Sequence, residues 1–184
     1  MPEPVVADPQ DLAALGRDVM DASLLHGDFV LSSGARSAYY LDKYLFETQP
    51  GILRRLGRAL AAHVPADTQR IAGTELGAVA LAAAVSLETD LPFVIARKAS
   101  KEYSTAKLVE GLLEAGDRVV VVEDVITSGA QAIRAAERIR DAGGVVTTIV
   151  AVIDREEGGQ AAVSAAGLTL VSLFTRTSLG LDPA

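Results

Sequence analysis

The chain has 184 residues, of which 49% are hydrophobic and 22% charged, so it is long and apolar enough to bury the core of one globular domain. It has no cysteine and only two histidines, which excludes disulfides and cysteine-ligated zinc and argues against a histidine metal site. The net charge of −7 disfavours non-specific nucleic-acid binding, and no apolar run is as long as a membrane span, so we expect a cytoplasmic protein with neither kind of partner.

The N-terminal stretch predicts a helix and then a hairpin. Asp8-Pro9 is an N-cap followed by proline, and helical spacing continues to about Leu25, which places His26 in the turn that ends the helix. Two short strands around the turn Ser33-Gly34 are predicted by FVLSSGARSAYYLDKY. Tyr39 and Tyr40 adjoin the second strand, where they are either a packing pair or ligand contacts.

A strand, a glycine loop and a helix come next. After a helix over 50–63, a short strand over 70–72 ends in Gly73-Thr74-Glu75-Leu76-Gly77, and 78–87 is a helix of small residues suited to close packing on a sheet. Alone the glycine loop is weak evidence for a site. Paired with a second such loop, it is a candidate anion-binding turn.

Four of the 17 basic residues then fall within eleven positions. They follow a buried strand over 91–96 and belong to the polar segment RKASKEYSTAKLVEG, which predicts a mobile loop or hairpin. An ordinary solvated surface loop is the alternative. We favour a lid, because the cluster follows a strand end on the sheet edge where open α/β folds bind ligands. The four cations are Arg97, Lys98, Lys101 and Lys107.

The stretch RVVVVEDVITSGAQAIRAAERIRDA, residues 118–142, is the most informative part of the chain. Val119 to Val122 predict a strand buried on both faces, and the acids Glu123 and Asp124 follow where it should end. A small-residue turn, Thr127-Ser128-Gly129-Ala130, precedes a helix. Strand, small-residue loop and helix aim backbone N–H groups at a phosphate, although neither a Walker loop nor GxGxxG is present.

Carboxylates beside a phosphate site need a separate role, because they repel a bare phosphate. A ligand with a phosphate and a vicinal diol supplies one, since the turn holds the phosphate while the acids accept hydrogen bonds from the hydroxyls. That description fits a ribose 5-phosphate donor. Solvated acids at a strand end with an ordinary N-cap turn are the alternative.

The remaining segments complete an α/β pattern. Gly143-Gly144 ends the helix, a strand over 145–153 runs into DREEGG, and a short helix over 161–166 precedes a last strand over 168–174. Arg155 is either a surface ion pair or a partner for a ligand carboxylate. Alternating strands and helices predict a parallel sheet covered on both faces, with a small N-terminal extension.

The stretch VVVVEDVITSGA closely resembles the phosphoribosyl-diphosphate signature of type I phosphoribosyltransferases. Three further segments, FVLSSGARSAYYLD, LETDLPFVIARKASKEYSTAKLVEG and VIDREEGG, are similar to orotate phosphoribosyltransferases. The resemblance implies the type I phosphoribosyltransferase fold over residues 1–184, with an N-terminal helix and hood at about 1–45 and a mobile catalytic loop at about 97–110. It also implies transfer of phosphoribosyl from phosphoribosyl diphosphate to orotate, Mg²⁺, and a homodimer whose loop reaches the partner's site.

The same resemblance implies residue roles. Lys101 and Asp124 are the expected catalytic residues, and Gly73 to Gly77 the diphosphate turn. Orotate is expected at Thr127, Arg155, Tyr39 and Tyr40. Magnesium is expected on the donor's diphosphate and ribose hydroxyls, without an assigned protein ligand. The donor is expected at Arg97, Lys98, Lys101, Tyr103, Glu123, Asp124, Val125, Ile126, Thr127, Ser128, Gly129, Ala130, Gln131, Thr74 and Glu75.

The chain also departs from the family pattern. Tyr103 replaces a histidine that many members carry, and the diphosphate turn lacks the lysine of some members, so we expect a stronger dependence on magnesium. A transferase for uracil or a purine base is one alternative, against which Arg155 argues, because a neutral base needs no carboxylate partner. A catalytically silent regulator that senses phosphoribosyl diphosphate is another.

Overall fold

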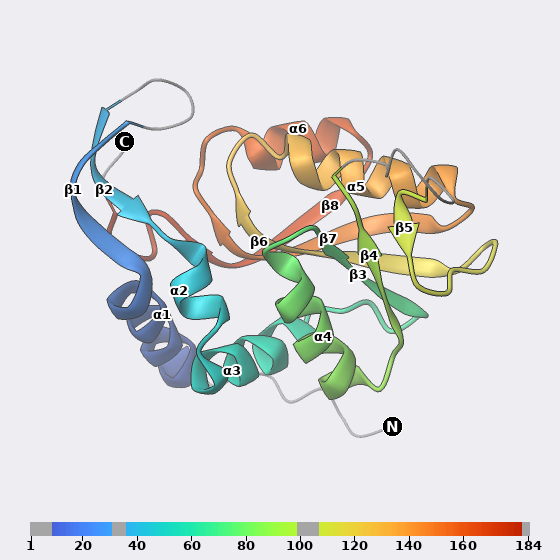
Figure 1. The fold of residues 1–184 in the computed structure, drawn as a ribbon, viewed down its shortest axis with the longest axis horizontal. Coiled ribbons are helices and arrows are strands. Elements are labelled where there is room, and N and C mark those ends of the chain that lie inside the picture. Colours follow the sequence, from blue (N-terminus) through green and yellow to red (C-terminus); the bar gives the residue numbers. More distant parts are fainter. Residues whose placement is uncertain (1–8, 31–35, 99–106, 182–184) are drawn as a thin grey trace.

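Figure 1 shows the fold in the computed structural model, which describes residues 9–30, 36–98 and 107–181. Helices and strands alternate through most of the chain, as the apolar patterns predicted. The elements are α1 (Pro9–Ser23), β1 (Leu24–Val30), β2 (Arg36–Leu41), α2 (Lys43–Glu47), α3 (Pro50–Ala61), β3 (Arg70–Thr74), α4 (Ala78–Thr89), β4 (Phe93–Ala96), β5 (Val109–Glu110), β6 (Arg118–Ile126), α5 (Ala130–Asp141), β7 (Val145–Asp154), α6 (Gly159–Ala165) and β8 (Thr169–Thr175).

A six-stranded sheet with the order β5-β4-β3-β6-β7-β8 forms the centre of the molecule. The pairs β3–β4, β3–β6, β6–β7 and β7–β8 are parallel, and the short β5 pairs antiparallel with the edge of β4. This confirms the predicted α/β class with a central, mostly parallel sheet. It also places β6, the strand of the acidic pair, between β3 and β7.

Helices cover both faces of this sheet, as Figure 1 shows, with α5 and α6 on one side and α1 to α4 on the other. Successive residues of β6 point to opposite faces, because side chains alternate along a strand. Val120 and Val122 pack with the helices α1 to α4, whereas Val119 and Val121 pack with α5 and α6. The β-branched run is therefore buried on both faces, as expected.

The small-residue helix α4 lies very close to the sheet. A Cβ added to Gly73 of β3 would lie 2.7 Å from the Cβ of Ala82, so glycine is needed for this approach. Gly73 also begins the predicted diphosphate turn, whose position is thus set by tight packing of α4.

The N-terminal hairpin differs in detail from the prediction. Helix α1 ends at Ser23, and His26 lies in β1, opposite Tyr39 of β2, rather than in a turn. The reason is that residues 24–30 pair with 36–41, an interaction that local spacing does not reveal. The two strands form a separate sheet. The predicted turn Ser33-Gly34 lies outside the described residues.

Helix α2 was not predicted. Asp42 caps it by accepting a hydrogen bond from the N–H of Tyr44 at 3.2 Å. The helix has five residues and buries Phe46 and Glu47. It connects the hairpin to α3.

Candidate active site

The carboxyl ends of neighbouring parallel strands meet at one edge of the sheet. There β3 ends at Thr74, β4 at Ala96, β6 at Ile126 and β7 at Asp154. Most described residues that the sequence assigned to ligands lie in or directly after these ends. This edge is where ligands bind in open α/β folds.

The acidic pair lies inside β6 rather than after it, because β6 stays paired with β7 as far as Ile126 opposite Asp154. Glu123 and Asp124 are buried, with exposures of 2% and 1%. The hydroxyl of Thr74 donates to Oε1 of Glu123 at 2.7 Å, and the N–H of Asp124 donates to the same atom at 3.1 Å. Neither acid is a solvated strand end, so that alternative is wrong.

The second carboxylate oxygen of Glu123, Oε2, is buried and has no hydrogen-bond partner. Burial, and after it the charge of Asp124, raise the pKa of Glu123 to about 8. A buried acceptor without a partner is costly, so it is a natural place for a ligand hydroxyl to donate.

Two residues that the sequence did not reveal complete this cluster. Nζ of Lys43 donates to Oδ2 of Asp124 at 2.5 Å, and Glu47, one helical turn further along α2, is 2% exposed. Burial, and next the charge of Asp124, raise the pKa of Glu47 to about 8. Burial would lower the pKa of Lys43, but the charge and hydrogen bond of Asp124 outweigh it, so that pKa is raised.

Gly77 lets this cluster lie against the predicted diphosphate turn. A Cβ at Gly77 would collide with Oδ2 of Asp124 and would lie 3.0 Å from Nζ of Lys43. The end of the turn therefore contacts the acidic strand directly. Within the turn, the peptide bond between Glu75 and Leu76 is cis.

The turn after β6 has the geometry expected of a phosphate site. Thr127 and Ser128 are exposed, and Gly129 has a φ of 77°, a left-handed conformation that favours glycine. Helix α5 begins at Ala130, and the first N–H groups of a helix lack partners within it. Gln131 is half-buried in the first turn.

The start of the basic segment is anchored to this edge. The N–H of Lys98 donates to Oε2 of Glu75 at 2.7 Å, and the guanidinium of Arg97 lies 3.8 Å from the other oxygen of Glu75. From α5, Arg138 donates to the carbonyls of Arg97 and Lys98 at 2.6 and 2.8 Å. Lys101 and Tyr103 lie outside the described residues.

The residues expected to contact orotate fall into two groups. Thr127 and Arg155 follow neighbouring strand ends, and the N–H of Arg155 donates to the carbonyl of Ile126 at 2.8 Å. The Arg155 guanidinium pairs with Glu157 at 2.9 Å. Tyr39 and Tyr40 lie in β2, and the ring of Tyr40 packs against that of Phe29, with 5.6 Å between the ring centroids.

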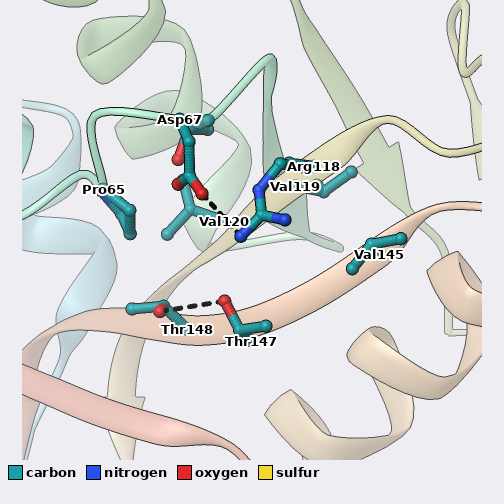
Figure 2. Close-up of a pocket in the computed structure, with 9 residues that line it drawn as sticks. Pro65, Asp67, Arg118, Val119, Val120, Val145, Thr147 and Thr148 are labelled. Carbon is teal, nitrogen blue, oxygen red and sulfur yellow. Dashed lines mark hydrogen bonds and ion pairs between the residues drawn. The ribbon is translucent and has the colours of Figure 1, made fainter.

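Figure 2 shows a pocket at the other edge of the sheet, near the amino ends of β6 and β7. An ion pair between Arg118 and Asp67, with 2.5 Å between nitrogen and oxygen, lies at its wall. None of the predicted site residues lines it. Its lining is Pro65, Asp67, Thr68, Arg118, Val119, Val120, Val145, Thr147 and Thr148.

Within 9–30, 36–98 and 107–181, no three His, Cys, Asp or Glu side chains form a group able to hold a metal ion. In the same ranges no helix is long and apolar enough to cross a membrane.

Comparison with known proteins gives a consistent result. The model of the phosphoribosyl transferase domain family matches residues 47–165. The orotate phosphoribosyltransferase of Methanocella arvoryzae is 46% identical over 153 residues, which cover 83% of this chain and 87% of that relative.

Solved structures agree. The orotate phosphoribosyltransferase of Mycobacterium tuberculosis in complex with Fe(III) dicitrate matches with a TM-score of 0.83 at 32% identity, covering 93% of this chain and 99% of that one. The same enzyme in complex with 5-phospho-α-D-ribosyl 1-diphosphate matches with a TM-score of 0.76 at 31% identity, with the same coverage.

Proposed function

This chain belongs to the phosphoribosyl transferase family, and from that premise we propose that it transfers the phosphoribosyl group of 5-phosphoribosyl 1-diphosphate to orotate. The products are orotidine 5′-monophosphate and diphosphate, and the reaction is a step of pyrimidine biosynthesis. The observation that carries the proposal is the buried pair Glu123–Asp124 directly before a glycine turn and a helix N-terminus.

That arrangement suits each part of the donor. The turn from Thr127 to Gly129 and the start of α5 offer N–H donors to the 5-phosphate. The unpartnered Oε2 of Glu123 offers an acceptor to a ribose hydroxyl. Gly73 to Gly77, together with the basic segment that begins at Arg97, borders the place of the diphosphate.

The same residues suit the chemistry. The bond from the anomeric carbon to diphosphate breaks while a bond to a ring nitrogen of orotate forms, and positive charge develops on the ribose ring, by analogy with glycoside chemistry. The negative charge of Asp124 beside the ring favours that state. Arg155 lies where it can exchange Glu157 for the carboxylate of orotate, a bidentate pairing that arginine favours.

Magnesium accompanies the donor in this proposal. The ion binds to diphosphate and ribose hydroxyl oxygens, so Glu123 and Asp124 hold the hydroxyls rather than the ion. When bound, it neutralises charge on the departing diphosphate. The buried oxygen of Glu123 that lacks a hydrogen-bond partner fits this division.

Three further expectations belong to the same proposal, concerning the hood, the loop and the dimer. The hood at about 1–45 closes over the base, Lys101 and Tyr103 of the loop at about 97–110 meet the diphosphate, and two subunits exchange their loops. We place the protein in the cytoplasm, because both substrates are anions, the donor a multiply charged one, and such ions do not cross a membrane unaided.

A parallel assay tests the function. The protein is incubated with phosphoribosyl diphosphate and Mg²⁺, and orotate, uracil, adenine and hypoxanthine are offered separately. We expect consumption of orotate alone, and Arg155→Ala raises the KM for orotate while that for the donor changes little. Turnover of uracil or a purine would favour the alternative transferase, and binding of the donor without turnover of any base would favour the sensing regulator.

A further inference from the structure

Helix α2 directs two ionisable side chains at one catalytic carboxylate. Lys43 and Glu47 are four residues apart and therefore lie on the same face of the helix. Lys43 pairs with Asp124, and the electrostatics of Glu47 are dominated, after burial, by the same carboxylate. No other part of the proposed mechanism uses α2.

We propose that Lys43 is a positioning residue for the transfer reaction, which fixes the carboxylate of Asp124 against Gly77 at the end of the diphosphate turn. This inference rests on the proposed function and extends it to a residue outside the signature stretch. Glu47, on the same face of α2, is a second buried acid whose charge interacts with that of Asp124.

The contacts of Asp124 support this role. Its Oδ1 accepts from the N–H of Val125 at 2.6 Å, and its Oδ2 accepts from Lys43 at 2.5 Å. Both oxygens of the carboxylate are thus held, which restricts its orientation. Gly77 makes the arrangement possible, because any side chain there would occupy the place of Oδ2.

Charge also favours a positioning role. Glu47, Glu123 and Asp124 are all buried, and Lys43 is the cation within hydrogen-bonding distance of this cluster. The lysine side chain is 27% exposed, so it reaches from solvent into the cluster. Its loss would leave Asp124 among buried acids without a counter-charge, and the carboxylate would turn away or bind a proton.

A double-mutant cycle tests the proposal. The variants are Lys43→Met, Asp124→Asn and the double variant, each assayed for kcat and for the KM of donor and orotate. We expect Lys43→Met to lower kcat about 10- to 100-fold, the scale of a misplaced catalytic group, with little change in the KM of orotate. If Lys43 acts through Asp124, the double variant is no slower than Asp124→Asn alone.

Arg54→Met is the matched control, because Arg54 is an exposed cation on the neighbouring α3; we expect wild-type kinetics from it. Thermal unfolding of all variants shows that the assays use folded protein. Multiplicative effects of the two substitutions, or wild-type kcat in Lys43→Met, would overturn the proposal. If the wild type turns over no base, the proposed function fails, and calorimetric titration with phosphoribosyl diphosphate still measures the coupling of Lys43 to Asp124.

Discussion

Burial controls the protonation of the acid cluster at the sheet edge. Glu47 and Glu123 each have a pKa raised to about 8, first by burial and then by the charge of Asp124. Each also has one buried oxygen without a partner. Without substrate, the glutamates of the cluster therefore hold protons at neutral pH, and Lys43 balances the charge of Asp124. A ribose hydroxyl that donates to Oε2 of Glu123 would favour the charged form of that glutamate.

The raised pKa values predict how stability depends on pH. Their ordinary value is 4.5, so the folded protein binds protons that the unfolded chain has released, and this stabilisation is lost as pH rises from about 4.5 through about 8. We expect the free energy of unfolding to fall by up to about 5 kcal/mol over this window, since raising one pKa from 4.5 to about 8 corresponds to about that free energy at about 1.4 kcal/mol per pKa unit, and the two sites interact. Urea unfolding at pH 5, 7 and 8.5 measures it.

Glu47→Gln replaces one of these titrating carboxyl groups with a neutral amide. The unfolding free energy of this variant should therefore vary less with pH than that of the wild type. Glu137→Gln is the control, because Glu137 is an exposed acid on α5. Asp117 does not affect stability in this pH window, because the hydrogen bond from Arg70 lowers its pKa. The stability that its charged form contributes is lost only at more acid pH. An unchanged pH dependence in Glu47→Gln would contradict the prediction.

Site residues that lie within one sequence motif could be predicted from the sequence. Site residues that the fold brings in from a distant segment could not. Glu123, Asp124 and the following turn were found because acids, small residues and a helix start occur in one stretch. Lys43 and Glu47 were missed, since a five-residue helix is too short for a periodic pattern. Their one local signal was Asp42, an N-cap residue followed by a basic and an acidic side chain four positions apart.

At the scale of elements, apolar runs predicted the strands but not their ends. The buried runs of β6 and β7 were recognised because β-branched residues buried on both faces have no helical period. Pairing between distant segments decided where they stop. Thus β6 continues through its acids because β7 remains opposite, and β1 begins at Leu24 because β2 pairs with it.

Helix α5, whose N-terminus we propose as the phosphate site, also holds the start of the basic segment. Its Arg138 donates to two carbonyls at the end of β4, those of Arg97 and Lys98, from which the basic segment departs. Glu75 of the diphosphate turn holds the N–H of Lys98 from the other side. The turn, the basic segment and α5 are therefore mechanically connected.

We predict that Arg138→Ala weakens the use of the donor. Two charge-assisted hydrogen bonds to the backbone are lost, and one such bond contributes about 1.5–3 kcal/mol, so kcat/KM for phosphoribosyl diphosphate should fall roughly tenfold or more. The KM for orotate should change little. Steady-state kinetics with each substrate varied in turn measure both quantities.

Arg134→Ala on the same helix provides the comparison, because Arg134 is exposed and its substitution removes the same charge. Equal kinetics in the two variants would show that Arg138 has no positioning role. A fall in kcat/KM for orotate alone would contradict the prediction that Arg138 supports the use of the donor.

For the whole molecule, the distribution of charge raises the question of subunit number. The chain carries a net charge of −7, yet both proposed substrates are anions, so cations must be concentrated at the site. Arg97 and Lys98 lie at the sheet edge, but Arg97 is already paired with Glu75 and Glu110. Lys101 of the basic segment would add positive charge at the site, whether it comes from the same chain or from a second subunit.

A mixing experiment tests whether Lys101 acts across a dimer. Lys101→Ala and Asp124→Asn are each expected to be nearly inactive. In a twofold dimer with exchanged loops, a mixed dimer has one site that combines the intact Asp124 of one subunit with the intact Lys101 of the other. Random exchange makes about half of the dimers mixed, so about a quarter of wild-type activity should return. Native mass spectrometry counts the mixed dimers, and their formation without recovered activity would place Lys101 in its own subunit's site.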